Sequence, residues 1–366
     1  MKHYTSSRKP RSGERIGKYR GEFMKRYLTV AASVALISLS TAASAATVIK
    51  VQTANAAGSF SLKYINEVWV PKLEAMTYGN IKIDIRPTKS VVPHRETPRA
   101  VAAGILQGDL NAVAYFAGRD PVFSVLGDLI AGYDTPEQKQ MFFRFGGGVE
   151  ILQKAYDKHY GGKIIVVGAG PYNRESFVST VPIRTVADLK GLKLRSPEGM
   201  AAEVFRRAGA TPTSIPLPDL YTALDKKVVD AADASSYTNN NSLGFNKIAK
   251  YPLYPGIHSM AVVQFIINKK VWNKIGPEGQ AALTTWYYAM WPDVTRATEV
   301  EDRKLVAADI AGTGTKGITV INWSQVERDK FRVIAAGAWK DMSTKSALAK
   351  EAYDAHIKFM KILGLL

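Results

Sequence analysis

The chain has 366 residues, no cysteine and a formal net charge of +17 at pH 7. Its first 46 residues carry nine Lys/Arg against two Asp/Glu, which leaves +10 for the remaining 320 residues. The later charges are dispersed, with no basic block interleaved with aromatic residues, which argues against nucleic-acid binding and suits attraction of an anionic ligand.

The N-terminus has the pattern of a targeting segment. Two basic residues follow Met24, Leu28–Leu39 is apolar, and Ala43-Ser44-Ala45 supplies small residues. We expect a cleaved signal peptide over residues 1–45, a translation start at Met24 and a periplasmic mature chain. The alternative is a buried or membrane helix, but the apolar run is short for a bilayer span. A chain exported without disulfides must take its stability from its core.

The first part of the mature chain alternates strands and helices. Strands are expected at residues 47–53, 81–85 and 110–116, with helices at 62–76 and 98–107. This β-α-β-α-β order is typical of a doubly wound α/β unit. A helix-rich stretch, 136–160, and a strand at 164–167 follow, and a Gly-Ala-Gly-Pro sequence at 168–171 ends the strand.

The α/β pattern then restarts. We expect strands at 177–179, 192–195, 230–234, 262–268 and 318–322, and helices at 200–208, 217–224, 277–310 and within 324–366. The predicted fold is therefore α/β with two lobes and a hinged cleft. Lobe I comprises residues 46–170 and 261–300, and lobe II comprises 171–260 and 301–366 with a helical C-terminal extension. Ligands of open α/β sheets bind beyond the carboxyl ends of strands.

Arg195 lies at such a strand end, before Ser196 and Pro197. A guanidinium presents donors in a fixed fork that matches a carboxylate in two parallel hydrogen bonds. The alternative is an ordinary surface arginine. The residues on either side of Arg195 favour the first interpretation.

Five spaced elements resemble the DctP-type solute-binding proteins of TRAP (tripartite ATP-independent periplasmic) transporters. They are Asp188–Arg195 (DLKGLKLR), Gly209–Pro212 (GATP), Tyr221–Leu224 (YTAL), Val229–Asp233 (VDAAD) and Lys250-Tyr251. The opening VQTANAAGS and the segment INKKVWNKIGPEGQAAL are also similar to the family. The resemblance implies a two-lobed periplasmic-binding-protein fold in which one long helix spans both lobes. It is closest to the branch that binds 2-oxo and 2-hydroxy acids.

The resemblance also implies roles for residues. Arg195 matches the arginine that binds the ligand carboxylate, and a second polar group would come from Pro171–Ser176, where Arg174 and Tyr172 are candidates. Phe116 and its neighbour Tyr115 could wall the pocket, or belong to the core. Tyr237, Asn239 and Asn240 could reach ligand oxygens, or form an ordinary polar loop. His258 matches a family histidine for which a structural role is expected.

In the oxo-acid branch, an acidic residue and a side chain on a later strand can hold a metal ion that bridges to the ligand. Asp233 and Gln264 occupy those positions, and their oxygen atoms suit Na⁺ or Ca²⁺. Ala234 stands where that branch has tryptophan, so the pocket could be larger and take an aromatic or longer acid.

The expected function is a periplasmic receptor that captures an organic acid anion and delivers it to the small and large TRAP membrane subunits. A C4-dicarboxylate or aromatic acid as ligand, or a role as sensing partner of a receptor kinase, stays open. A secreted enzyme is disfavoured, because the chain has no GxSxG, no HExxH, no cysteine and only five histidines. Residues 324–366 could support a homodimer.

Overall fold

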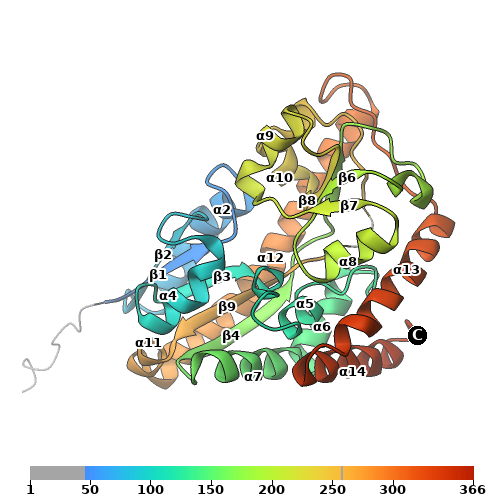
Figure 1. Cartoon of the computed structure of the whole chain (residues 1–366). Coiled ribbons are helices and arrows are strands. Elements are labelled where there is room, and N and C mark those ends of the chain that lie inside the picture. The colour runs from blue at the N-terminus through green and yellow to red at the C-terminus, as the bar shows by residue number, and fades with distance from the viewer. Residues whose placement is uncertain (1–45, 257–258) are drawn as a thin grey trace, which may run out of the picture. The chain divides into compact units, whose positions relative to one another are not determined.

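The computed structural model describes residues 46–256 and 259–366 (Figure 1). The expected signal peptide at 1–45 and His258 lie outside these ranges. Within them, no helix combines the length and apolar character that a bilayer crossing requires.

The first sheet has five strands and forms the centre of lobe I. Their order is β2 (Ile81–Arg86), β1 (Thr47–Thr53), β3 (Gly108–Ala112), β9 (Val262–Asn268) and β4 (Ile164–Pro171). β1 is parallel to β2 and β3, whereas β9 is antiparallel to β3 and β4. In β2 the isoleucines are buried and Lys82 is exposed, as alternation predicts. β9 is buried throughout, and β4 continues to Pro171 through the sequence expected to end it.

Helices cover this sheet on both faces (Figure 1). A helical segment runs from α2 (Phe60–Tyr64) through a π-helical turn (Ile65–Trp69) into α3 (Val70–Met76). The other helices of lobe I are α4 (Thr97–Ala103), α5 (Val122–Gly127), α6 (Pro136–Phe145), α7 (Gly148–Tyr160) and α11 (Lys269–Lys274). A short 3₁₀ helix, His94–Glu96, directly precedes α4, and another, Val113–Phe116, directly follows β3.

The second sheet has four strands and forms lobe II. Their order is β5 (Ser176–Ser179), β8 (Ala231–Ser235), β6 (Lys193–Arg195) and β7 (Thr211–Thr213). Its helices are α8 (Met200–Arg207), α9 (Leu220–Asp225) and α10 (Tyr237–Ser242). Three 3₁₀ helices, Val186–Leu189, Leu217–Asp219 and Phe245–Lys247, complete the lobe.

The long helix α12 (Gly276–Ile310) spans both lobes, as expected (Figure 1). Its first half packs on lobe I, where Trp286 and Met290 share a core cluster with Val51. Its second half packs on α10, and the Asp302 carboxylate accepts a hydrogen bond from the backbone N–H of Thr238 (2.6 Å).

The C-terminal helices differ from the expected assignment to lobe II. α13 (Gln325–Ser343) contacts α8 of lobe II and α5 of lobe I, and α14 (Ala347–Ile362) packs on α5 and α7 of lobe I. The His356 ring is fully buried there, against Tyr133 and Phe142. Since both helices pack within their own chain, these contacts do not support the homodimer expected through them.

The strand predicted at 318–322 is also wrong. Only Ile321 forms a bridge there, with Leu253. Residues 319–321 hydrogen-bond to the segment 250–254 beside β5, but single bridges do not make the continuous ladder of a strand.

Candidate functional site

Arg195 is buried in the interior of the second sheet, with 2% of its surface exposed. Its strand β6 has β8 on one side and β7 on the other, which fixes the backbone from both edges. The Nε–H donates to the carbonyl of Ile215 (2.8 Å), and Nη1 donates to the carbonyl of Asp233. Among the described residues, Nη2 makes no hydrogen bond. The guanidinium is therefore held rigidly with donor capacity to spare.

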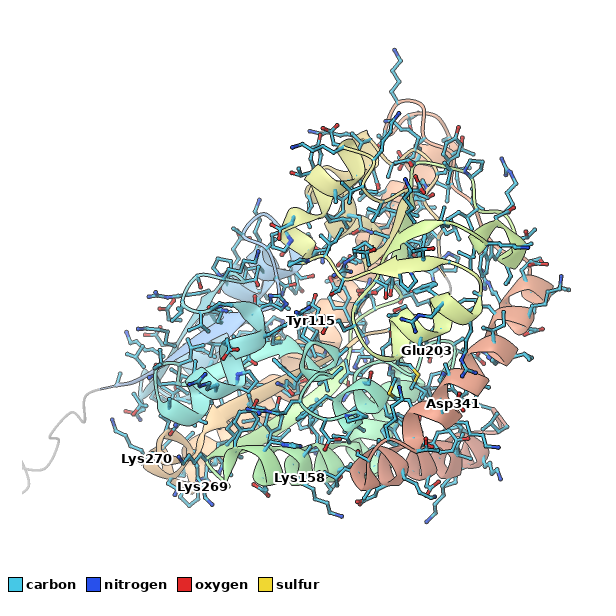
Figure 2. All side chains as sticks on the ribbon, in the orientation of Figure 1. Tyr115, Lys158, Glu203, Lys269, Lys270 and Asp341 are labelled. Atoms are coloured by element: carbon cyan, nitrogen blue, oxygen red, sulfur yellow. The ribbon has the colours of Figure 1, made fainter. Side chains whose placement is uncertain are left out.

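Arg195 lines a small pocket where the two lobes meet. Its volume is about 10 Å³, the space of about one water molecule, far below the roughly 300–1,000 Å³ typical of drug-sized ligands, so a ligand would enter only when the lobes move apart. Lobe I contributes His94, Arg95 and Tyr115, and Figure 2 shows Tyr115 in the region where the two lobes meet. Lobe II contributes Arg195 and the segments 197–198 and 214–216. We call this space the inner pocket.

Two buried carboxyl groups lie beside the guanidinium. Glu175 and Asp233 are within hydrogen-bonding reach of each other, and both interact electrostatically with Arg195. Burial raises the pKa of Glu175 well above its usual range, and the neighbouring Asp233 carboxylate adds to this shift. Burial also raises the pKa of Asp233. Two buried carboxyl groups this close repel each other when both are ionised, so each favours the neutral form of the other.

A buried ion pair extends this cluster into lobe I. The Lys139 ammonium donates to Asp128 Oδ1 (2.8 Å), and both side chains are almost fully buried. The Ser259 hydroxyl lies 2.6 Å from Asp128 Oδ2 and 3.1 Å from Glu175 Oε2. Polar contacts therefore run from helix α6 of lobe I to the acid pair of lobe II.

A separate polar network joins the lobes through Tyr172 and Asn239. The Tyr172 hydroxyl lies 2.7 Å from the hydroxyl of Ser61, which belongs to α2 of lobe I. Asn239 Nδ2 donates to Tyr172 Oη and to Ser61 Oγ (3.1 Å), and its Oδ1 accepts from the Ser61 N–H (3.3 Å). We call these three residues the lobe latch.

Of the ligand-binding candidates, Arg195 lines the inner pocket, Phe116 lines a neighbouring pocket, and Tyr172 and Asn239 form the latch. The other three face different partners. Arg174 Nη2 donates to the Asp134 carbonyl (2.8 Å), the Tyr237 hydroxyl donates to Asp309, and Asn240 Nδ2 donates to the carbonyls of Ser176 and Ser235.

The two metal-ligand candidates have different neighbours. Asp233 lies beside Glu175, whereas Gln264 Oε1 accepts from the Tyr156 hydroxyl (2.7 Å). Gln264 also interacts with Asp109, whose pKa burial raises to about 8. Gln264 does not lie beside Asp233 because it is in the middle of β9 in the first sheet, where it pairs with Asn111 of β3.

Several residues that line the inner pocket or adjoin Arg195 were not predicted from the sequence. His94 and Arg95 belong to a short 3₁₀ helix, and residues 214–216 belong to a loop, so no periodic pattern marks them. Glu175 follows Arg174 in the segment 171–176 that was predicted to supply a polar group. An acidic residue directly after an arginine candidate was the only feature of the sequence that pointed to Glu175.

Comparison with known proteins identifies the family of this chain. The family model of bacterial extracellular solute-binding proteins, family 7 (DctP), matches residues 51–346. A monocarboxylate 2-oxoacid-binding periplasmic protein of Nostoc sp. is 25% identical over 301 residues, covering 81% of this chain and 79% of the relative.

Solved structures are similar over most of the chain. A TRAP periplasmic solute-binding protein of Rhodobacter sphaeroides, in an apo open structure, is 36% identical with a TM-score of 0.70, covering 87% of this chain and 99% of that one. A protein of the same kind from Pseudoalteromonas atlantica, with bound sodium and pyruvate, is 22% identical with a TM-score of 0.74, covering 87% and 95%. The chain therefore belongs to the DctP family of solute-binding proteins, and its two-lobed fold is the one predicted from the sequence.

Proposed function

We propose that this protein is a periplasmic receptor that captures a small 2-oxo acid anion between its lobes and delivers it to the membrane subunits of a TRAP transporter. The observation that carries the proposal is the buried Arg195 guanidinium in the inner pocket. An anion buried there needs a fixed cationic partner, since an unpaired buried charge is very costly. Relatives that bind a 2-oxo acid, the Nostoc protein and the Pseudoalteromonas protein with bound pyruvate, support this ligand class.

The two lobes would close on the acid to bind it and open to release it. The latch and the inner pocket both use residues of the two lobes, so each is complete only when the lobes are together. A ligand that contacts both lobes shifts the population toward the closed form. The membrane subunits would then recognise the closed surface.

A cation beside the ligand is consistent with the charges at the site. Lys139 and Arg195 supply two positive charges, and Asp128, Glu175 and Asp233 supply three negative charges when ionised. Asp233 Oδ2 is buried and has no hydrogen-bond partner among the described residues. Carboxylate oxygens suit a hard cation such as Na⁺ or Ca²⁺. We therefore propose Asp233 and Glu175, rather than Gln264, as the side chains that would hold it.

That cation would offset the negative charges of the incoming acid and of the two carboxylates. Within residues 46–256 and 259–366, no three His, Cys, Asp or Glu side chains are grouped to hold a metal. The remaining oxygen ligands would therefore have to come from backbone carbonyls, water or the acid.

Calorimetry on the mature chain tests the proposal. Pyruvate, a longer 2-oxo acid, lactate, succinate and benzoate are titrated with and without Ca²⁺, and each mixture is then analysed for products. We expect the 2-oxo acids to bind one per chain, more tightly with Ca²⁺, and to be recovered unchanged. Binding of succinate or benzoate alone would contradict the proposed ligand class, and turnover would contradict the receptor role.

A further inference from the structure

A second pocket adjoins the inner pocket and opens more widely. Its volume is about 390 Å³, and Arg95, Tyr115 and Glu198 line both pockets. Two further arginines, Arg99 and Arg119, and one further acid, Glu96, line only the second one, so its charged lining has three arginines against two glutamates. We call it the outer arginine pocket.

Arg95 lies on the boundary between the two pockets. It belongs to lobe I, but its Nη2 lies 2.9 Å from Glu198 Oε1 and donates to Ser214 Oγ (3.1 Å), both in lobe II. The side chains of Arg95 and Glu198 are 45% and 40% exposed. An ion pair this exposed stabilises little, so an incoming carboxylate can replace Glu198 at low cost.

The charges of the outer pocket are only partly balanced by nearby carboxylates. Arg99 lies 3.9 Å from Glu96, at the limit of an ion pair. The Arg119 guanidinium lies over the Tyr160 ring, 5.6 Å from its centroid. Among the described residues, no carboxylate lies within 4 Å of Arg119. The pocket thus carries a positive charge at the approach to Arg195.

We propose that the outer arginine pocket is the entrance for the ligand, where a carboxylate is first held before it passes Arg95 and reaches Arg195. Arg99 and Arg119 draw the anion to the entrance, and the Arg95–Glu198 pair closes it once the lobes are together. This inference rests on the proposed function. Under this proposal, the residues of the outer arginine pocket control how fast the acid binds and leaves, whereas Arg195 supplies most of the binding free energy.

Stopped-flow measurement of pyruvate binding tests the entrance, with Trp291 as reporter because its ring lies 6.0 Å from that of Tyr172 in the latch. At low ionic strength, a unit positive charge raises the concentration of a monovalent anion about 10 Å away in water roughly twofold. We expect Arg119→Gln to lower kon about twofold and Arg99→Gln/Arg119→Gln about fourfold at ~10 mM salt. Both effects should vanish at ~0.5 M salt.

Two matched variants control for net charge. Lys270→Gln removes the same charge at the other end of lobe I, on α11, as Figure 2 shows. Glu198→Gln should raise koff about twofold by opening the Arg95 boundary, whereas Glu351→Gln, in an ion pair of similar exposure with Lys154, should leave koff unchanged.

Each result decides between the two proposals. If Lys270→Gln and Arg119→Gln slow binding equally, or if kon is unchanged in the double variant, the entrance proposal is overturned. The receptor proposal still stands in that case, provided that pyruvate binding depends on Arg195. An unchanged koff in Glu198→Gln overturns the closing role of Arg95. If no 2-oxo acid binds the wild-type chain, the proposed function fails, and the entrance fails with it.

Discussion

Replacing Arg195 by alanine should abolish tight binding of the acid. A guanidinium–carboxylate fork contributes two hydrogen bonds to charged groups, about 1.5–3 kcal/mol each. Their loss corresponds to a roughly 10²- to 10⁴-fold increase in Kd. Arg195→Lys keeps the charge but replaces the planar fork by a point donor, so we expect a roughly 10- to 100-fold increase. Calorimetry with pyruvate measures both.

The fold of each variant must be checked, because Arg195 also has a structural role. Alanine leaves the carbonyls of Ile215 and Asp233 without this donor, which costs about 1–3 kcal/mol each where they stay dry. Urea unfolding followed by circular dichroism gives the loss in stability, and binding is measured where the variant is folded.

Arg174→Ala is the matched comparison, since Arg174 is also part-buried and bound to a carbonyl but lies outside the inner pocket. Its Kd should stay within about threefold of wild type, since surface-type changes away from the ligand have small effects. A folded Arg195→Ala that binds pyruvate as tightly as Arg174→Ala would refute the reasoning.

Three further predictions follow from the lobe contacts and one buried acid. Tyr172→Phe removes the hydroxyl that accepts from Asn239, and since a hydrogen bond contributes about 1 kcal/mol, koff for pyruvate should rise roughly fivefold; an unchanged koff counts against the latch. Gly199→Ala should weaken binding, because the added Cβ would lie 1.9 Å from Ser124 Oγ of lobe I and hold the lobes apart, and because the φ of residue 199 is +82°. Adding Ser124→Ala should recover part of the affinity. If nothing is recovered, the backbone conformation alone is responsible. Burial raises the pKa of Asp109 to about 8, so the folded state holds a proton that the unfolded state loses near pH 4, and stability falls as pH rises between these values; Asp109→Asn should therefore raise Tm more at pH 8 than at pH 5, and an equal change at both would contradict this.

Local pattern was sufficient for most elements, and it singled out Arg195, whose role in binding stays a prediction. Strands 47–53, 81–85 and 262–268 were predicted within a residue, because alternation or a continuous apolar run reports burial directly. Arg195 was identified by its place at a strand end and by the surrounding motif. The segment 318–322 has a similar local pattern, but it pairs with residues 250–254 beside β5 through isolated bridges and not through a continuous ladder.

The residues that line the inner pocket with Arg195 were decided only by the tertiary structure. Arg95 lies a hundred residues earlier, in a helix of one turn, and meets Glu198 only where the lobes come together. Likewise, the separation of Gln264 from Asp233 follows from their being in different sheets. A sequence pattern records which way each side chain faces along its own strand or helix. Which faces meet depends on strand order, register and lobe closure, and these are set by contacts between distant parts of the chain.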